Sequence, residues 1–140
     1  MPDPLVVPAS TAPRADALPP TFVCSWADSG RDAAWVHVAG ELDLATAPLL
    51  EQTLGQPQLQ ARLVVLDLRE LAFIDSAGVH AMVNATTRAR LQGRRLVLLR
   101  GPPNVDRVFT LAGSLDDVEI GDVGLLEAPV ETRGEEVLAS

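Results

Sequence analysis

Ser76 is the side chain in this sequence that is best placed for regulated chemistry. It stands between Asp75 and two small residues, Ala77 and Gly78, at the start of a stretch with helical spacing. A serine hydroxyl at a helix start can cap free backbone N–H groups. A phosphate there would lie near the same N–H groups and the positive end of the helix dipole. The position therefore predicts a phosphorylation site, with a simple helix cap as the alternative.

Three other chemistries fit the residues less well. A hydrolase nucleophile at Ser76 would need glycine where Ile74 stands, and a base from a separate loop. An aspartyl phospho-acceptor at Asp67 would need an early acidic pair and a late lysine, and the chain has no lysine. One cysteine, two separated histidines and no Gly-x-x-x-x-Gly-Lys loop argue against metal and nucleotide sites. We therefore predict no enzyme activity, no metal and no cofactor.

Composition limits the partners and the compartment. The formal charge of −8 argues against direct nucleic-acid binding, which draws on clustered basic side chains. The single cysteine, Cys24, cannot form an internal disulfide and fits a reducing cytoplasm. No apolar run approaches the roughly 20 residues of a membrane helix, and the N-terminus lacks the pattern of a secretory signal. We expect a cytoplasmic protein with neither a membrane nor a nucleic-acid partner.

Alternating apolar patterns predict the elements that position Ser76. A Pro-rich flexible arm is expected over residues 1–20, one domain over 21–122 and an acidic tail over 123–140. Strands are expected at Thr21–Trp26, Ala33–Val38, Leu63–Leu68, Arg95–Arg100 and Val118–Ile120. Helices are expected at Thr46–Leu54, Ser76–Leu91 and Asn104–Leu111, with Gly55 ending the first.

This order predicts a single mixed, mostly parallel sheet of four to five strands, with three to four helices mainly on one face. The apolar run Leu63–Leu68 is typical of a central strand that is buried on both faces. Because function in such sheets gathers beyond the carboxyl ends of the strands, Asp43, Asp75 and Ser76 are expected at one end. The predicted core is Val64, Leu66, Leu68, Val79, Val83, Leu96, Leu98, Val108 and Leu111.

Four sequence blocks together resemble the STAS domain, which anti-sigma factor antagonists share with the tails of sulfate transporters. The blocks are Gly40–Asp43, Leu66–Leu68, Phe73–Val79 and Arg107–Phe109. Their order and spacing over about Phe22 to Ile120 make the resemblance specific, whereas the Asp-Ser-x-Gly piece alone would be weak. Without a transmembrane segment, the chain resembles the free-standing antagonists.

The resemblance implies a protein that binds an anti-sigma factor and so releases a sigma factor. The anti-sigma factor is expected to be a serine kinase that phosphorylates Ser76, and a serine phosphatase to reverse this. The implied partner-binding residues are Asp43, Asp75, Ser76 and Gly78, on a monomer or weak homodimer. Many members carry Ser or Thr where this chain has Ala77, which leaves Ser76 as the acceptor. The alternative is a non-enzymatic STAS subunit of a sensory or transporter assembly, with Ser76 only a helix cap.

Overall fold

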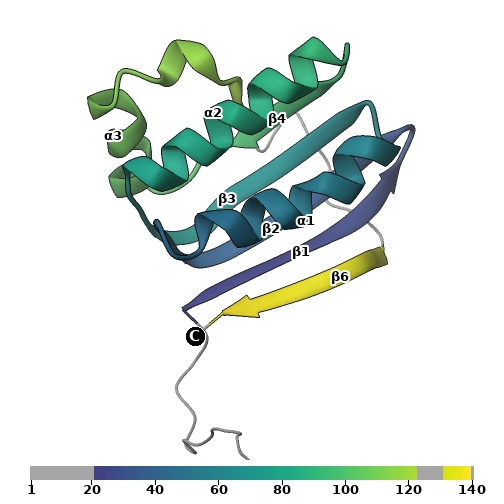
Figure 1. Ribbon diagram of the computed structural model, residues 1–140, viewed down its shortest axis with the longest axis horizontal. Helices are drawn as coiled ribbons and strands as arrows, with labels where there is room; N and C mark the ends of the chain where they lie inside the picture. The colour runs from purple at the N-terminus through teal and green to yellow at the C-terminus, as the bar shows by residue number, and fades with distance from the viewer. Residues whose placement is uncertain (1–20, 123–130, 140) are drawn as a thin grey trace, which may run out of the picture.

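The computed structural model describes residues 21–122 and the backbone of residues 131–139, which form one sheet with helices packed against it (Figure 1). The strands are β1 (Phe22–Gly30), β2 (Ala33–Leu42), β3 (Leu63–Ile74), β4 (Arg95–Leu99), β5 (Ile120–Gly121) and β6 (Glu131–Ala139). The helices are α1 (Ala47–Gln60), α2 (Ser76–Leu91) and α3 (Pro103–Leu111), followed by a 3₁₀ turn at Leu115–Asp117. The predicted arm, residues 1–20, lies outside the described residues.

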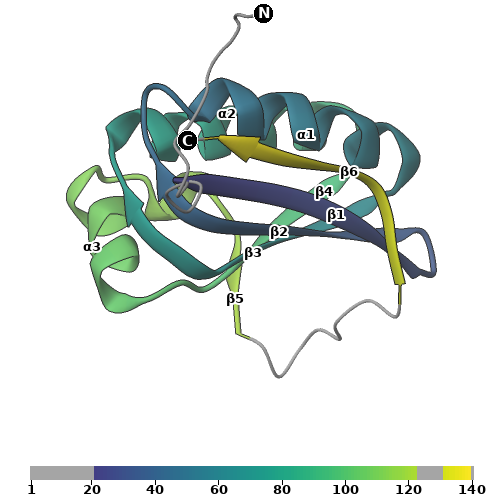
Figure 2. The ribbon, with the colours of Figure 1, turned by 90° about the horizontal axis from the view of Figure 1, so that it is seen from below.

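The sheet has the order β5-β4-β3-β2-β1-β6, with β3 near its centre. Strands β2, β3, β4 and β5 run parallel to one another, whereas β1 is antiparallel to both of its neighbours. Seen edge-on, α1 and α2 cover one face of the sheet and α3 lies towards one end (Figure 2). The prediction of a single mixed, mostly parallel sheet with helices mainly on one face is confirmed.

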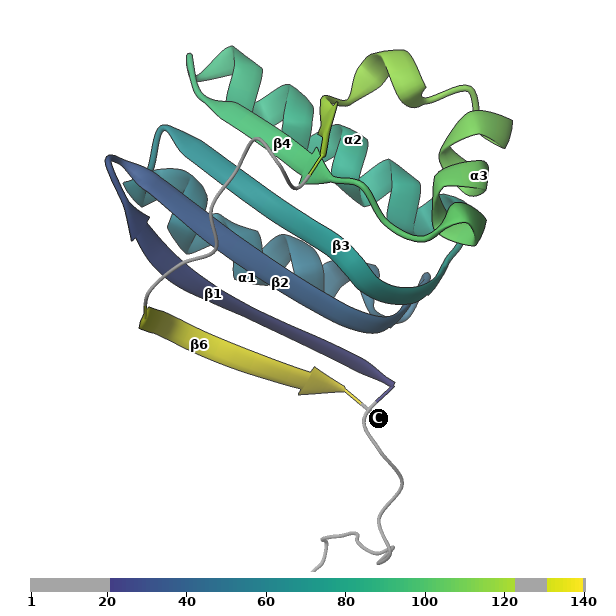
Figure 3. The same ribbon diagram turned by 180° about the vertical axis from the view of Figure 1, so that it is seen from behind.

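Strand β6 lies within the segment that was expected to be an acidic tail. It pairs antiparallel with β1, from Phe22 opposite Ala139 to Asp28 opposite Glu131, and brings the sheet to six strands (Figure 3). The sequence from 131 to 136, Glu-Thr-Arg-Gly-Glu-Glu, lacks the apolar alternation that marks a strand. Here the free backbone edge of β1 supplies the pairing instead, so the extra strand was not visible in the side-chain pattern.

Helix α1 is longer than predicted, because Gly55 does not end it. It continues through Pro57 to Gln60. Pro57 and Gln58 are buried in the last turns, and the side-chain amide of Gln58 donates to the carbonyl of Ala85 in α2 over 3.1 Å. These contacts with α2 outweigh the local cost of glycine and proline in a helix.

The core lies between the sheet and the helices and contains most of the positions predicted for it. Val64, Leu66, Leu68, Val79, Leu96 and Leu98 are buried, and Val83 and Val108 are partly buried. The prediction for Leu111 is wrong, since this side chain is 77% exposed. Val105 and Phe109 form the inward face of α3 instead, because residues four apart share a helix face.

Candidate functional site

Strands β2 and β3 end side by side, and their ends bring together the residues predicted for the site. Leu42 pairs with Ile74 in the parallel register. Just beyond that pair, the backbone N–H of Asp75 donates to the carbonyl of Leu42 over 3.1 Å. Asp43 follows Leu42 in the β2–α1 turn, and Ser76 follows Asp75 as the first residue of α2. We call this end of the sheet, formed by Asp43, Asp75 and Ser76, the Ser76 surface.

Asp75, and not Ser76, caps helix α2. The backbone of Asp75 is extended, and its Oδ1 accepts a hydrogen bond of 3.0 Å from the N–H of Gly78. Ser76 is exposed, and its hydroxyl has no hydrogen-bond partner in the part of the chain that the structure describes. The alternative interpretation of Ser76 as the cap of this helix is therefore wrong. The aspartate binds the free N–H group, which leaves the serine oxygen open to solvent.

Gly78 sets how closely α2 approaches the two strand ends. A Cβ atom at this position would lie 2.7 Å from Cγ1 of Ile74 and 2.9 Å from Cγ of Leu42. Real Cβ atoms do not come so close to other heavy atoms, so a side chain here would push the helix start away from β2 and β3. Gly78 is itself buried. It shapes the Ser76 surface from beneath instead of forming its outer face.

Asp43 organises the β2–α1 turn together with Thr46. Its Oδ1 accepts hydrogen bonds from the N–H groups of Ala45 at 3.0 Å and Thr46 at 3.1 Å. In return, the N–H of Asp43 donates to the Thr46 hydroxyl over 2.9 Å. These bonds hold the half-buried carboxylate in one place. Asp43 is thus a turn-forming residue as well as a negative charge on the surface.

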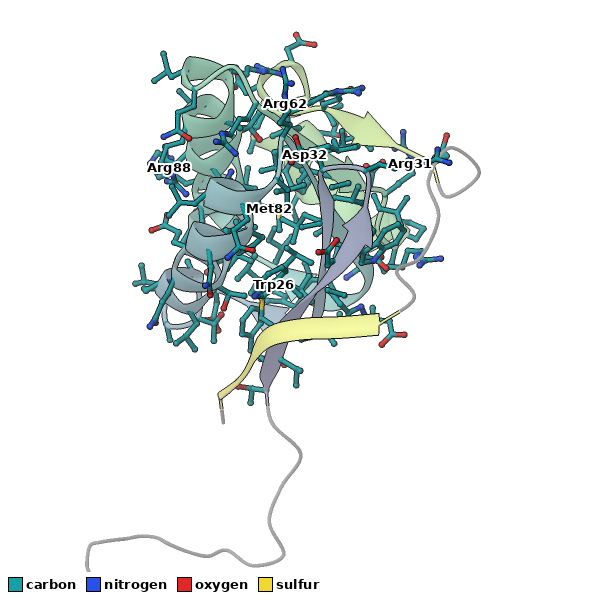
Figure 4. The ribbon with its side chains drawn as sticks, turned by 90° about the vertical axis from the view of Figure 1, so that its right-hand side faces the viewer. Trp26, Arg31, Asp32, Arg62, Met82 and Arg88 are labelled. Atoms are coloured by element: carbon teal, nitrogen blue, oxygen red, sulfur yellow. The ribbon has the colours of Figure 1, made fainter. Side chains whose placement is uncertain are left out.

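The carboxylates at the Ser76 end of the sheet differ from others in the molecule because no described residue neutralises them. Glu41 is exposed and lies opposite Phe73 at the end of β2. No described residue forms an ion pair with Glu41, Asp43 or Asp75. Arginines gather at the opposite end, where β3 and β4 begin and α2 finishes, as Figure 4 shows for Arg62 and Arg88. The Ser76 surface is therefore acidic.

A second polar cluster lies on the sheet face that is turned away from the helices. Asp67 of β3 is buried and accepts hydrogen bonds from Arg69 Nε at 3.0 Å, Arg69 Nη2 at 2.9 Å and Trp35 Nε1 at 3.3 Å. Burial opposes its ionisation, but His37 and Arg69 outweigh this and hold the pKa of Asp67 well below its usual range. Both carboxylate oxygens are engaged in these contacts. Asp67 is thus a structural residue that joins β2 to β3.

His37 lies between two carboxylates of this cluster. Its Nδ1 is 3.9 Å from Oδ2 of Asp67, and its Nε2 is 3.4 Å from Oε1 of Glu70. Asp67 first, and Glu70 in addition, raise the pKa of His37 above its usual value against the opposing effect of partial burial. The imidazole is therefore held in a setting that favours its charged form.

Other reactive groups offer no chemistry at the Ser76 surface. Cys24 is buried in the core, and burial raises the pKa of its thiol to about 12, so it is not a nucleophile at neutral pH. No group of three or more metal-ligating side chains occurs within residues 21–122. In the same part of the chain, no helix combines the length and the apolar character needed to cross a membrane.

Residues 28–123 match the family model of the STAS domain. An anti-sigma-B factor antagonist of Listeria monocytogenes is 34% identical over 89 residues, which cover 63% of this chain and 78% of the relative. The solved structure of an anti-sigma factor antagonist from Mycobacterium paratuberculosis has a TM-score of 0.65 at 23% identity, covering 74% of this chain and 88% of that one. The unphosphorylated anti-sigma factor antagonist SpoIIAA has a TM-score of 0.61 at 20% identity, covering 71% and 87%. At such identities, the two solved structures show a shared fold alone.

Proposed function

Because this chain belongs to the STAS domain family, we propose that it is an anti-sigma factor antagonist which binds its partner through the Ser76 surface. The observation that carries the proposal is the exposed Ser76 hydroxyl, which no described residue engages and which lies at the same end of the sheet as the carboxylates of Asp43 and Asp75. Binding of the antagonist to an anti-sigma factor releases the sigma factor. The chain acts by binding and not by catalysis, in the cytoplasm, as a monomer or weak homodimer.

Phosphorylation of Ser76 has opposite effects on the fold and on the interface. A phosphate adds about −1.5 to −2 charges. The start of α2 tolerates this charge, because free N–H groups and the positive end of the helix dipole lie there. At the interface the same charge stands beside Asp43 and Asp75, and it must lose its water when a partner docks. The fold therefore persists while binding weakens.

The two enzymes that set the switch are proposed to act on the one hydroxyl. The anti-sigma factor is itself the serine kinase, and a serine phosphatase restores the binding form. Ala77 offers no neighbouring hydroxyl, so Ser76 is the acceptor at this helix start. The acidic character of the surface favours a partner with basic side chains around its docking site.

A STAS subunit of a sensory or transporter assembly is the weaker alternative. In that account Ser76 is needed only as a helix cap. The cap of α2 is Asp75, whose carboxylate binds the N–H of Gly78. Ser76 therefore has no capping duty that would explain a serine at this position.

Release of a sigma factor tests the proposed function directly. Purified serine-kinase anti-sigma factors from the same organism are each loaded with their sigma factor and mixed with this chain without ATP. We expect free sigma factor to appear on size-exclusion chromatography with one of them, in proportion to the antagonist added. A sigma factor that stays bound in every pair, at antagonist concentrations well above those of the complexes, contradicts the proposal.

A further inference from the structure

Leu44 and Phe73 are large apolar residues near the ends of β2 and β3, and solvent reaches both side chains. Leu44 is 77% exposed in the β2–α1 turn, and Phe73 is 46% exposed at the end of β3. Leu44 comes two residues after Leu42, and Phe73 comes two residues before Asp75. The backbones of Leu42 and Asp75 are joined by a hydrogen bond. Two residues of extended chain span about 7 Å at most, so both backbones lie close to that bond.

Packing within the chain does not account for these two side chains. Strand alternation directs Ile74 into the core and Phe73 away from it. In the turn, Asp43 and Thr46 make the hydrogen bonds, and position 44 requires no apolar residue. A single exposed leucine is ordinary on a protein surface. Two large apolar residues on the same strand ends as the exposed serine indicate a binding surface.

Resting on the proposed function, we infer that Leu44 and Phe73 are the apolar anchors with which the Ser76 surface enters the anti-sigma factor. Interface centres depend on a few buried apolar or aromatic side chains, with polar groups at the rim. The partner then presents apolar pockets for Leu44 and Phe73, and basic groups opposite Asp43 and Asp75. An interface that buries both anchors spans the strand ends between them, where Ser76 lies, so a phosphate on this residue must be dehydrated before the complex can form.

A partner protein fits this surface better than a second copy of the chain does. In a two-fold dimer the same patch faces itself. Glu41, Asp43 and Asp75 of one copy would then stand against the same carboxylates of the other, and none of the three has an ion-pair partner among the described residues. Like charges set against each other at an interface oppose binding. The occupant is therefore a surface of different charge, as the anti-sigma factor is proposed to have.

The chain supplies matched controls for the anchors. Leu59 and Leu91 are 71% and 82% exposed. They lie at the C-terminal ends of α1 and α2, away from the Ser76 surface. Each of the four side chains is replaced by alanine, and its Kd for the purified anti-sigma factor is measured by calorimetry. We expect Leu44→Ala and Phe73→Ala each to weaken binding by about 10- to 100-fold. Leu44→Ala should melt like the parent, whereas Phe73→Ala loses the covered part of its ring and should melt at a slightly lower temperature while staying folded at the temperature of the titration. Leu59→Ala and Leu91→Ala should bind like the parent.

Two results would contradict the inference that Leu44 and Phe73 anchor the complex. The first is unchanged affinity of Leu44→Ala and Phe73→Ala for an anti-sigma factor that the parent binds, which leaves the proposed function intact. The second is loss of self-association in these variants on sedimentation, with affinity for the anti-sigma factor unchanged, which assigns the patch to a second copy. A parent chain that binds no anti-sigma factor contradicts the anchors and the proposed function together.

Discussion

The backbone N–H of Asp75 donates a 3.1 Å hydrogen bond to the carbonyl of Leu42, which ties the start of α2 to the end of β2. The carboxylate of the same residue accepts a hydrogen bond of 3.0 Å from the N–H of Gly78. Asp75 thus uses its backbone to hold the strand ends together and its side chain to begin the helix. Ser76 takes part in neither hydrogen bond, but both bonds fix the position of its backbone at the surface.

The roles of Asp75 and Ser76 predict different costs of substitution. Asp75→Ala removes the cap of α2 and should lower the free energy of unfolding by about 0.5–2 kcal/mol. Asp75→Asn should retain most of the free energy of unfolding of the parent, since asparagine caps a helix as well as aspartate does. Ser76→Ala should change the stability by less than about 0.5 kcal/mol. Urea titration measures all three, and a larger loss for Ser76→Ala than for Asp75→Ala would show that the serine is the cap.

Two glycines in helices are expected to respond oppositely to alanine. At Gly78 a Cβ would lie 2.7 Å from Ile74 and 2.9 Å from Leu42, so Gly78→Ala should destabilise the protein by about 1–3 kcal/mol. At Gly55 a Cβ would meet no atom within 4 Å, so Gly55→Ala should stabilise it by about 0.4–1 kcal/mol. Thermal and urea unfolding of both variants test this contrast. The same sign for the two substitutions would contradict the close approach at Gly78.

Replacement by alanine should cost much free energy of unfolding at Leu66 and almost none at Leu111. Leu66→Ala should lower the free energy of unfolding by about 2–5 kcal/mol, since this side chain is completely buried in the central strand. Leu111→Ala should change it by less than about 0.5 kcal/mol, because the side chain is exposed. Equal melting temperatures of the two variants would mean that the structure assigns their burial wrongly.

The His37 cluster predicts a loss of stability as the pH rises. The pKa of His37 in the folded protein is raised above 6.5 by Asp67 and Glu70, so protonation favours the folded state. This contribution is complete below the unfolded value and disappears as the pH rises through the folded one. Arg69 also contacts Asp67, but it keeps its charge over this range. The free energy of unfolding is compared at about pH 5.5 and about pH 9. His37→Gln should show a smaller decrease in the free energy of unfolding than the parent, and an equal decrease would contradict the role of His37.

Much of the fold was predictable because local pattern and tertiary structure agree. Helix α2 begins at Ser76 and ends at Leu91 as its spacing indicates, and the apolar run from Leu63 became the central strand. Prediction failed where long-range contacts decide. Gly55 lies inside α1 because the turns beyond it pack on α2, and β6 depends on the free edge of β1.

The meeting of Asp43, Asp75 and Ser76 at one end of the sheet was predictable, but the structural role of each residue was not. The strand order was enough to expect Asp43, Asp75 and Ser76 at one end of the sheet. Aspartate and serine are both good capping residues, so the sequence could not decide which of the two neighbours caps α2. Only the geometry shows the hydrogen bond from Gly78 to Asp75. Exposure of Phe73 likewise depends on which face of β3 the helices cover.

The affinity of the anti-sigma factor for this chain, with and without phosphate on Ser76, tests the central claim most directly. The chain is phosphorylated by the kinase with ATP, the site is mapped by mass spectrometry, and both forms are titrated by calorimetry. We expect phosphate on Ser76 alone and a loss of affinity of about 100-fold or more, since buried like charges cost several kcal/mol. Ser76→Ala should bind like the parent, and Ser76→Asp should show a smaller loss. Phosphate on Thr86, on Thr87 or nowhere, together with Ser76→Asp binding as tightly as the parent, would contradict the switch.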